Sequence, residues 1–521
     1  METVLNLPKQ LIEVSGEEDE DECRAPVWLG LRRVHSWQFS PLEAYNEHSQ
    51  QEYVRYSVWE VAAGVTSDVD VVKSLLDGSC KARRHPGTLD VRTVSLPEPL
   101  KEAAHAVIQD YPEKNVQKDA KVLNQYLCSR QAALEPEEAK MRYHEVREKI
   151  KMEDDIDPDF PNIPEEERQR LHDSLRSKVY ERMKKEVYHW QAIQYDTYKC
   201  VLYLAARLAP DFAALVQIMS DMKKRDPGFT PLTMLDFGSG VGSGMWAMDH
   251  VWPHTCREVV FVDSSSDMND LADRLLRGGN ADKPRLVREG GTFFKQFLPL
   301  SNLLKYDLVI SSRSLFEIPN INMRLKTIDV LWQKTSGYLV LVETGSNEGY
   351  RLVQEARDYL LELSRKAQEE GEPNPEGYVF APCPHDNFCP RFFDGSNIPC
   401  NFEVDYKPLA LGRKQSAQRE KFTYVVLKRG MREKSSEKQW PRLVEDPLCR
   451  KKHVVCRVCT PSGTLREVTA TKRRHSAECY KLMRHSRWGD LVPVQLSEVP
   501  DPSNVDTQDG DELSEPEQIQ N

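Results

Sequence analysis

The sequence predicts an α/β protein whose centre is a doubly wound, largely parallel sheet. The first observation is the stretch LTMLDFGSGVGSGMWAMDH at 232–250, which reads as a buried strand, a glycine-rich turn and the beginning of a helix. The second is that three further apolar runs follow, VVFVD at 259–263, YDLVIS at 306–311 and GYLVLVETG at 337–345. Strands that alternate with helices in this way favour a parallel sheet with helices on both faces.

The first 85 residues predict no fold. They contain the acidic run EEDEDE at 17–22, which favours a solvated, disordered extension. A mitochondrial presequence is rich in Arg and Ser and poor in acids, and this beginning has the opposite composition. With 521 residues the chain has room for two or three domains. No apolar run approaches the roughly 18 to 20 residues of a membrane-spanning helix, so we expect no membrane contact.

Residues 86–224 predict a helical region that leads into the sheet. The stretch PDFPNIPE at 158–165 interrupts it, because proline disfavours helix on both of its sides. A long helix is predicted over 177–208, and another over 211–228. Both have apolar residues spaced at three and four, as a core-facing helix requires.

The long helix carries the sequence YHWQ, with His189 in it. A single histidine in a helix is usually a structural residue, and we expect that role for His189. The alternative is a helix that covers a ligand pocket with Trp190 or Tyr195.

The turn after the first strand is the predicted ligand site. Gly238, Gly240 and Gly242 lack Cβ atoms, so they permit positive φ and let a ligand approach the backbone closely. The alternative is a purely structural turn between strand and helix. Asp263 ends the second strand, where a carboxylate could accept both hydroxyls of a ribose.

Asp236 separates two kinds of nucleotide site. A dinucleotide places its pyrophosphate at the first helix N-terminus, where the Asp236 carboxylate would repel it, whereas a cationic ligand would be attracted. The DxGxG turn together with Asp263 resembles class I S-adenosylmethionine-dependent methyltransferases, whose ligand carries a sulfonium, an ammonium and a ribose. We therefore expect S-adenosyl-L-methionine at this turn, with a dinucleotide fold as the alternative.

Five cysteines in the C-terminal region predict a metal site. Cys383, Cys389 and Cys400 lie within APCPHDNFCPRFFDGSNIPC, and Cys456 and Cys459 lie within HVVCRVC. Thiolates gathered in this way bind zinc or an iron–sulfur cluster. The spacing favours zinc, with the later pair as one zinc knuckle, whereas the prolines that directly follow two of the cysteines are also found beside iron–sulfur ligands. Five thiols for four positions leave one spare.

The same region is strongly basic. Residues 406–490 contain 22 lysines and arginines against 8 acids, interleaved with histidines, Tyr480 and Trp488. Such a surface neutralises phosphates while its rings offer stacking positions for bases. RNA is favoured over DNA, because no helix reads as a major-groove recognition element. Residues 420–430, EKFTYVVLKRG, predict a strand that could return to the sheet edge.

These motifs together resemble a family. DFGSGVGSGMWA, FVDSSSDM, YHWQ, FAPCPHDNFCP, HVVCRVC, TKRRH and SRWGDL are similar to the mitochondrial small-subunit ribosomal assembly family, and the resemblance covers about 84–493. It implies a class I methyltransferase-like (Rossmann-like) fold that binds S-adenosyl-L-methionine, and a [4Fe–4S] cluster. The cluster ligands that the resemblance implies are Cys383, Cys389, Cys400 and Cys459, with Cys456 as the spare thiol. It also implies a monomer in the mitochondrial matrix, associated with the small ribosomal subunit, its rRNA and its assembly intermediates.

Catalysis is not expected from these residues. Amino-group methylation commonly uses an Asn/Asp-Pro-Pro-aromatic turn after the fourth strand, and cytosine C5 methylation needs a cysteine nucleophile. The corresponding stretch, SSRSLFEIP, supplies neither, and Glu317 is its only acid. We therefore expect a catalytically silent scaffold that binds rRNA. The alternatives are an active S-adenosylmethionine-dependent rRNA methyltransferase and a zinc-stabilised RNA-binding homologue of such an enzyme.

These expectations divide the chain into five segments. They are an unassigned extension at 1–85, a helical region at 86–224, a methyltransferase-like domain that binds S-adenosyl-L-methionine at 225–372, a cysteine-rich, basic region packed on the sheet at 373–495, and an acidic, disordered tail at 496–521. The tail is assigned by charge, since residues 497–521 hold eight acids and neither Lys nor Arg.

Overall fold

The computed structural model describes most of the chain between residues 60 and 497. The described residues are 60–61, 64–89, 91–154, 158, 160, 163–186, 190–286, 291–299, 301, 303–369, 377–412, 416–432 and 439–497. Three features of the sequence therefore lie outside the described residues. They are the acidic run at 17–22, His189 and the acidic tail beyond residue 497.

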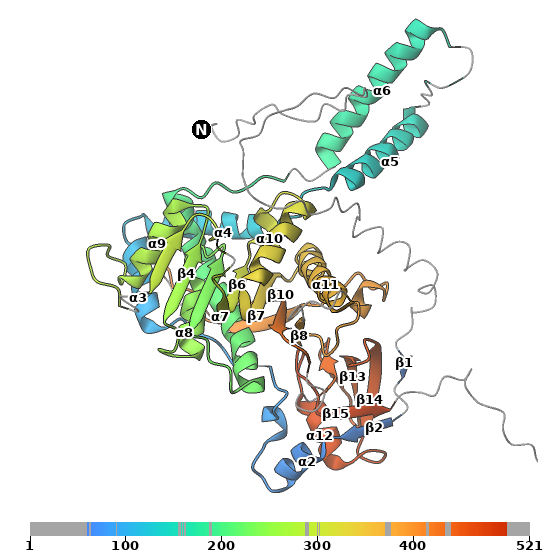
Figure 1. Cartoon of the computed structure of the whole chain (residues 1–521). Coiled ribbons are helices and arrows are strands. Elements are labelled where there is room, and N and C mark those ends of the chain that lie inside the picture. Colours follow the sequence, from blue (N-terminus) through green and yellow to red (C-terminus); the bar gives the residue numbers. More distant parts are fainter. Residues whose placement is uncertain are drawn as a thin grey trace, which may run out of the picture. The chain divides into compact units, whose positions relative to one another are not determined.

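The central sheet has the strand order β5-β4-β3-β6-β7-β10-β8, with β9 paired to β10. Strands β3 to β7 are parallel, whereas β10 runs antiparallel to both of its neighbours, β7 and β8. This order, with one reversed strand near the edge, is that of the class I methyltransferase sheet, and it confirms the predicted fold class (Figure 1). The bounds are β3 Thr233–Phe237, β4 Glu258–Val262, β5 Thr292–Lys295, β6 Tyr306–Ser312, β7 Thr335–Thr344, β8 Gly377–Ala381, β9 Phe402–Tyr406 and β10 Gln418–Arg429.

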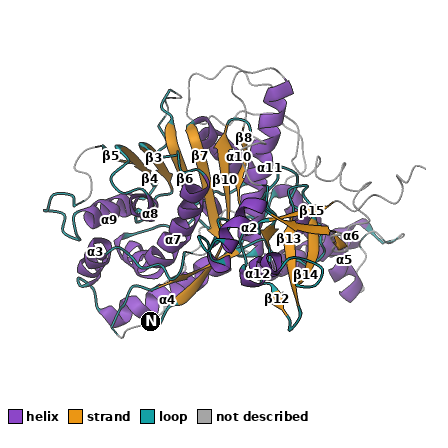
Figure 2. Ribbon diagram, turned by 90° about the horizontal axis from the view of Figure 1, so that it is seen from below, coloured by secondary structure: helices purple, strands orange, loops and turns teal. Residues whose placement is uncertain are grey.

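Helices cover both faces of this sheet because its strands alternate two apolar faces. In β3, Met234 packs with α3, α7, α8 and α9, whereas Leu235 packs with α10 and α11 on the other side. Both side chains are fully buried, as the two-sided apolar pattern predicts. Figure 2 shows the strands of this sheet with the helices that flank them. The helix bounds are α3 Glu98–Ile108, α4 Glu113–Ser129, α7 Thr197–Arg225, α8 Ser243–Val251, α9 Ser266–Leu276, α10 Ile321–Gln333 and α11 Asn347–Glu369, with the short 3₁₀ turn η2 at Leu315–Glu317.

Helix α7, Thr197–Arg225, differs from the two helices predicted over 177–208 and 211–228 both in where it begins and in having no break between them. The predicted long helix is interrupted before Asp196, whose side chain accepts a hydrogen bond from the Lys199 N–H and caps α7. The predicted break near 209–210 is absent, because α7 continues through Pro210, where it is buried against the sheet and α8. Tertiary packing here outweighs the helix-breaking tendency of proline.

Helix α7 is also apolar enough to span a membrane by length and composition alone. Its most apolar 18-residue window has a mean hydropathy of 1.4, and 83% of that window is buried in the protein. Among the described residues it is the single helix that passes this test. Because charged residues flank and interrupt the apolar stretch, it does not stand out in the sequence as a continuous apolar run. Its burial identifies α7 as a core helix of the sheet domain.

Two helices before α7 pack on each other. They are α5 Pro136–Asp154 and α6 Glu165–Glu186, which lie side by side in Figure 1. Their contact is a small apolar cluster that includes Val146, Ile150, Leu175 and Val179. The remaining residues of both helices are mostly charged, and some of them pair, as Arg182 does with Glu153. This explains the low mean hydropathy of the two helices.

A second, smaller sheet forms the C-terminal region. Its strand order is β1-β14-β13-β11, β12 also pairs with β13, and β15 pairs separately with β2. Its core contains alternate residues of β13 and β14, together with one face of α12. The bounds are β1 Glu60–Val61, β2 Gly64–Ser67, α2 Val69–Leu76, the 3₁₀ turn η1 Ala82–Arg84, β11 Arg442–Leu443, β12 Leu448–Cys449, β13 His453–Cys459, β14 Leu465–Thr471, α12 Ala477–His485 and β15 Val494–Ser497.

The last strand of the central sheet is internal and not at the edge. The predicted strand at 420–430 becomes β10, which lies between β7 and β8. The connection from β8 to β9, residues 382–401, holds three cysteines and the 3₁₀ turn η3 Pro390–Phe392. This connection therefore leaves from, and returns to, the same side of β10.

Candidate cofactor pocket and cysteine cavity

The glycine turn between β3 and α8 has the backbone conformation that its sequence predicts. Gly238, Gly240 and Gly242 have φ values of 65°, 48° and 79°, in the left-handed region that favours glycine. A Cβ atom on Gly238 would lie 2.4 Å from the Ser314 Cβ atom, so this position also requires a close approach. A Cβ atom on Gly240 would lie 3.8 Å from a ring carbon of Tyr203, which is an ordinary van der Waals contact, so no close approach requires a glycine here and its positive φ does.

Asp236, at the end of β3, is a buried carboxyl group. It is 2% exposed, and its Oδ2 atom has no hydrogen-bond partner among the described residues. Burial, together with the nearby Asp263 carboxylate, raises the pKa of Asp236 to about 7. A Cβ atom on Gly244 would lie 2.5 Å from that oxygen, which explains the glycine in the first turn of α8. An anionic site without a partner is suited to a cationic group.

Asp263 lies beside the turn, as predicted, and it has a second role. Its Oδ2 accepts a hydrogen bond from the Gly240 N–H and its Oδ1 accepts one from the Ser265 N–H, both at 2.9 Å. Burial raises the pKa of Asp263, and these two backbone bonds lower it. The carboxylate therefore holds the glycine turn in place, and the second lone pair of each oxygen is left for a ligand hydroxyl.

The chain segment before α7 contacts the carboxyl ends of the strands. The Trp190 Nε1–H donates to the Phe316 carbonyl at 2.8 Å, and the Ser265 hydroxyl donates to the Tyr195 carbonyl at 3.0 Å. These contacts place Trp190 and Tyr195 beside the predicted pocket, which matches the alternative of a covering segment. The segment is not helical at this point, contrary to the sequence prediction.

Glu317, the only acid in the stretch SSRSLFEIP at the end of β6, is part of an ion pair. Arg130 forms an ion pair with it, and the same guanidinium donates to the Phe316 carbonyl at 3.2 Å. The Arg130 side chain is buried, whereas the Glu317 side chain is partly exposed. Sequence reasoning missed Arg130, because 187 positions separate it from its partner.

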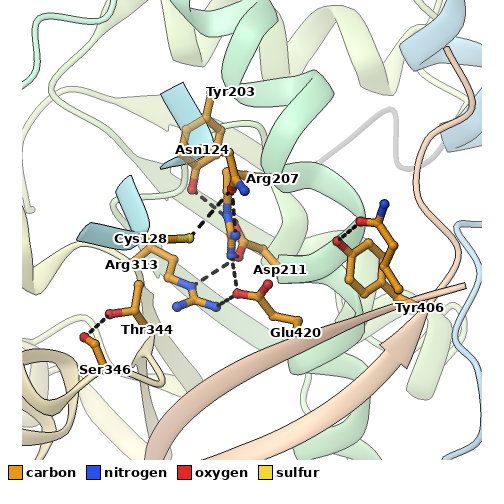
Figure 3. A network of polar contacts seen from close by, with 11 residues as sticks. Asn124, Cys128, Tyr203, Arg207, Asp211, Arg313, Thr344, Ser346, Tyr406 and Glu420 are labelled. Carbon is orange, nitrogen blue, oxygen red and sulfur yellow. Dashed lines mark hydrogen bonds and ion pairs between the residues drawn. The ribbon is translucent and has the colours of Figure 1, made fainter. Parts of the chain in front are cut away.

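A buried ion network fixes the loop that follows β6 (Figure 3). Arg313, with φ at 61°, pairs with Asp211 at 3.2 Å and with Glu420 at 2.8 Å. Arg207 pairs with the same two carboxylates. The two positive and two negative charges of this network balance. The network joins α7, β10 and the loop after β6. The side chain after β6 thus points into a structural network, where a methyltransferase would need a catalytic group.

Glu343, at the end of β7, is a further buried acid that sequence reasoning did not single out. It is fully buried, and its Oε1 accepts a hydrogen bond from the Leu315 N–H at 2.8 Å. Burial raises its pKa to about 7. A periodic strand pattern could not reveal it, because it lies within an apolar run.

The second site is a cavity lined by the four cysteines that the family resemblance implies. Cys383, Cys389 and Cys400 reach it from the β8–β9 connection, and Cys459 reaches it from β13. Cys383, Cys389 and Cys459 are buried and Cys400 is half-buried. The described residues contain no group of three or more His, Cys, Asp or Glu side chains placed to hold a single metal ion.

Cys456 does not line this cavity. It lies three positions before Cys459 on the same strand, and side chains an odd number apart point to opposite faces of a sheet. Cys456 is buried among the apolar side chains of the C-terminal core, and burial raises the pKa of its thiol. The zinc-knuckle interpretation of this pair is therefore wrong in geometry, since the two thiols diverge.

Two cysteine sulfurs lie within hydrogen-bonding distance of buried polar side chains. The Tyr350 hydroxyl lies 3.1 Å from the Cys389 sulfur, and the His385 Nε2 atom lies 3.2 Å from the Cys459 sulfur. Tyr350 comes from α11, and His385 comes from the connection after β8. Polar groups on sulfur are a normal feature of thiolate ligands.

Buried arginines surround the same cavity. Arg357 and Arg442 are at most 2% exposed, and the Nε atom of each lacks a hydrogen-bond partner among the described residues. The hydrogen bond with Cys389 lowers the pKa of the Cys383 thiol, and these two guanidinium groups lower it further. Each guanidinium also has an acidic neighbour, since Arg357 pairs with Asp358 and Arg442 lies 3.8 Å from an Asp221 carboxylate oxygen. The thiols of the cavity therefore lie close to buried cations that already take part in ion pairs.

The strand order, the glycine turn and its two acids define a protein of the class I methyltransferase-like type. Comparison with known proteins then identifies the family. Residues 197–493 match the family model "Mitochondrial small ribosomal subunit Rsm22". The chain belongs to this Rsm22 family, which confirms the resemblance seen in the sequence.

Two relatives and one solved structure illustrate the similarity. "Ribosome assembly protein METTL17, mitochondrial" of Homo sapiens is 36% identical over 412 residues, covering 79% of this chain and 86% of that protein. "Ribosome assembly protein RSM22, mitochondrial" of Saccharomyces cerevisiae is 21% identical, covering 56% of this chain and 66% of that protein. A putative RNA methyltransferase from Pyrococcus horikoshii is 10% identical over 42% of this chain and 84% of that one, with a TM-score of 0.24.

Proposed function

We propose that this chain is an assembly factor of the mitochondrial small ribosomal subunit, acting in the matrix, that binds rRNA and transfers no methyl group. Both relatives are mitochondrial ribosome assembly proteins by name. The observation that carries the proposal is the cavity where four cysteines from two separate sheets meet. A cofactor held there would join the methyltransferase-like sheet to the basic C-terminal region.

The residues fit a [4Fe–4S] cluster held by Cys383, Cys389, Cys400 and Cys459. Four thiolates and a cluster carry net negative charge, which the buried guanidinium groups of the cavity would balance. When bound, the cluster supplies a rigid covalent link between its ligands. The chain's own residues position the sulfurs, with Tyr350 as a donor to one of them.

The cluster would set the geometry of an RNA-binding surface. Three ligands belong to the sheet domain, whereas Cys459 ends β13, whose partner β14 leads directly to the exposed Arg473 and Arg474. Exposed cations bind phosphates well only when their spacing is held. A C-terminal region with a small core gains that rigidity from a metal link.

The turn between β3 and α8 would hold S-adenosyl-L-methionine. Asp236 would face the cationic methionine part of the ligand, and the backbone of the three glycines would contact the ligand. Asp263 would accept hydrogen bonds from the ribose hydroxyls. The Oδ2 atom of Asp236, which has no hydrogen-bond partner among the described residues, and the left-handed conformation of the three glycines support this assignment. Methyl transfer is not supported, because the side chains that follow β6 already have structural partners. Glu317 forms an ion pair with Arg130, and Arg313 forms ion pairs within the buried network.

The test compares protein with and without the cluster. Protein purified without oxygen should be brown and contain about four irons per chain. Removal of the cluster should weaken binding to small-subunit rRNA and make the C-terminal region sensitive to protease, while affinity for S-adenosyl-L-methionine stays unchanged. Equal RNA affinity of the two forms would overturn the structural role of the cluster. One zinc and no iron per chain would support the zinc alternative.

An active rRNA methyltransferase is the second candidate, and the intact glycine turn with both acids favours it. Transfer of labelled methyl from S-adenosyl-L-methionine to small-subunit precursors tests it directly. Incorporation that disappears in an Asp236→Asn variant would show that the chain is an enzyme.

A further inference from the structure

An open pocket of about 450 Å³ lies in the C-terminal region, away from both sites described above. One wall is the segment from Leu75 to Arg83, at the end of α2 and the beginning of η1. The other wall is the exposed face of α12, with Glu478, Lys481 and His485. Its volume lies within the range of small-ligand pockets in proteins.

The N-terminal wall is firmly attached to the C-terminal sheet. Strand β2 pairs with β15, and the His85 Nε2 atom lies 3.0 Å from the Ser486 hydroxyl. The Leu89 N–H donates to Asp490 at 2.7 Å, and Val71 packs with Leu482 in a shared apolar cluster. The segment lies outside residues 197–493, which match the family model, yet it completes this pocket.

The pocket combines an apolar base with a basic rim. Leu75 and Leu76 line it, and Leu76 is 70% exposed. Lys81, Arg83 and Lys481 line it as well, against the single lining acid Glu478. All three cations are exposed.

Further exposed cations extend the rim in one direction. The Arg484 guanidinium donates to the Arg450 carbonyl at 2.9 Å, so the end of α12 lies against the turn at 450–452, and the turn at 472–474 follows the neighbouring strand β14. These two turns contribute Arg450, Lys451, Lys452, Lys472, Arg473 and Arg474, all exposed. A polyanion could follow this path for several phosphates.

We infer that the pocket receives one unpaired nucleotide of the bound RNA. Its base would lie against Leu75 and Leu76, and its flanking phosphates would contact Lys81, Arg83 and Lys481. The inference rests on the proposed RNA-binding function and names the feature of the RNA that this surface selects. Unpaired bases can be turned out of a strand and placed in a pocket, whereas bases in an A-form duplex cannot.

The experiment measures fluorescence anisotropy of the cluster-containing full chain with a labelled single-stranded RNA, over a range of salt concentrations. The triple variant Lys81→Gln/Arg83→Gln/Lys481→Gln should lower the log–log salt slope by about two, since each phosphate contact to a single strand contributes about 0.7. Leu76→Ser should weaken binding about fivefold with an unchanged slope, because it removes apolar contact and no charge. A duplex of the same sequence should lose much less affinity in Leu76→Ser.

Matched controls keep the test specific. Lys326→Gln removes an exposed cation of α10, and Val69→Ser shortens an exposed apolar side chain of α2 outside the pocket. Both should bind like the unmodified chain. Because all substituted side chains are exposed, folding should be preserved, and circular dichroism with iron content verifies it.

The outcomes separate the two proposals. If Arg473→Glu/Arg474→Glu weakens binding while the triple variant and Leu76→Ser do not, the pocket inference is wrong and the RNA-binding function stands. A lowered slope in the triple variant without any effect of Leu76→Ser would show a phosphate contact alone and would overturn the nucleotide pocket. No RNA binding by the unmodified chain would overturn the proposed function itself.

Discussion

The two candidate cofactor sites of this protein, the glycine turn and the cysteine cavity, are built in opposite ways. The glycine turn, residues 236–244, is one continuous stretch, completed by Asp263 at the end of the adjacent strand. The cysteine cavity takes its thiols from positions up to 76 residues apart, and its arginines come from α11 and β11. One site forms wherever two neighbouring strands form. The other exists only when two sheets are docked.

This difference predicts where each site is vulnerable. The turn depends on backbone conformation at single positions, so a substitution there should affect one ligand and nothing else. The cavity depends on contacts between regions, so a change there should affect the cofactor, the docking of the C-terminal sheet and RNA binding together. Four experiments probe this contrast, from the largest expected effect to the smallest.

The largest effect should come from Cys459→Ser. Because Cys459 is the only cavity thiol from the C-terminal sheet, its loss should remove the cluster and reduce bound iron to near zero, while S-adenosyl-L-methionine still binds. Cys456→Ala is the matched control on the same strand and should keep its iron, because its side chain faces the other way. Loss of iron in the control alone would reverse the assignment.

Arg442→Met should destabilise the fold by about 3 kcal/mol, because it removes a buried cation and leaves its partners unpaired. Arg442 donates to the Gly489 carbonyl at 2.6 Å and lies 3.8 Å from Asp221, linking the C-terminal sheet to α7. Urea denaturation measures the change. Arg450→Met, at an exposed position, should be nearly neutral; an equal loss there would show that the effect is not one of burial.

Gly240→Val should weaken binding of S-adenosyl-L-methionine by at least about tenfold, because a branched side chain does not tolerate φ near 48° and would enter the ligand space. Iron content should stay unchanged. Calorimetry measures the affinity. The control Gly78→Val also places valine at positive φ, 79°, but far along the chain from the glycine turn. It should leave the affinity for S-adenosyl-L-methionine intact. Unchanged affinity in Gly240→Val would move the ligand away from this turn.

The smallest effect is a pH dependence. The folded pKa of Asp236 is raised from 3.8 to about 7, so its burial costs stability progressively as pH rises from about 4 through about 7. Only the ionised carboxyl attracts a cationic ligand. Affinity for S-adenosyl-L-methionine should therefore increase about eightfold between about pH 6 and about pH 7.5.

Asp236→Asn should bind more weakly and lose this pH dependence. Calorimetry at both pH values checks the result. If the asparagine variant keeps the same increase, another group titrates, and the buried Glu343 carboxyl, with its pKa raised to about 7, becomes the first candidate for substitution.

The fold and the glycine turn were predictable because their signals are local. Apolar runs, glycines and the terminal acids of strands lie within a few residues of the structures they form, so β3, β4, β6 and β7 follow from the sequence. The break before α7 was missed although its signal is local, because Asp196 caps the helix through the Lys199 N–H and the apolar spacing runs on through this position. The position of β10 inside the sheet was likewise set by pairing with β7, which no local pattern encodes.

The cysteine cavity could be predicted only in part. Spacing alone pointed to zinc and grouped Cys456 with Cys459, and the family resemblance was needed to choose among five thiols. Strand geometry then separates these two cysteines. Arg130, Arg357 and Arg442 were invisible in the sequence, because a buried arginine reads as a surface residue until its partners, many positions away, are known.

The division of the four cysteines between two parts of the chain also bears on truncated products. Cys383, Cys389 and Cys400 lie in the connection that follows β8, whereas Cys459 lies at the end of β13, later in the chain than β10. A chain that stops before residue 459 therefore contains three of the four proposed ligands. If the proposed cluster needs all four thiols, its retention would distinguish finished molecules from truncated ones.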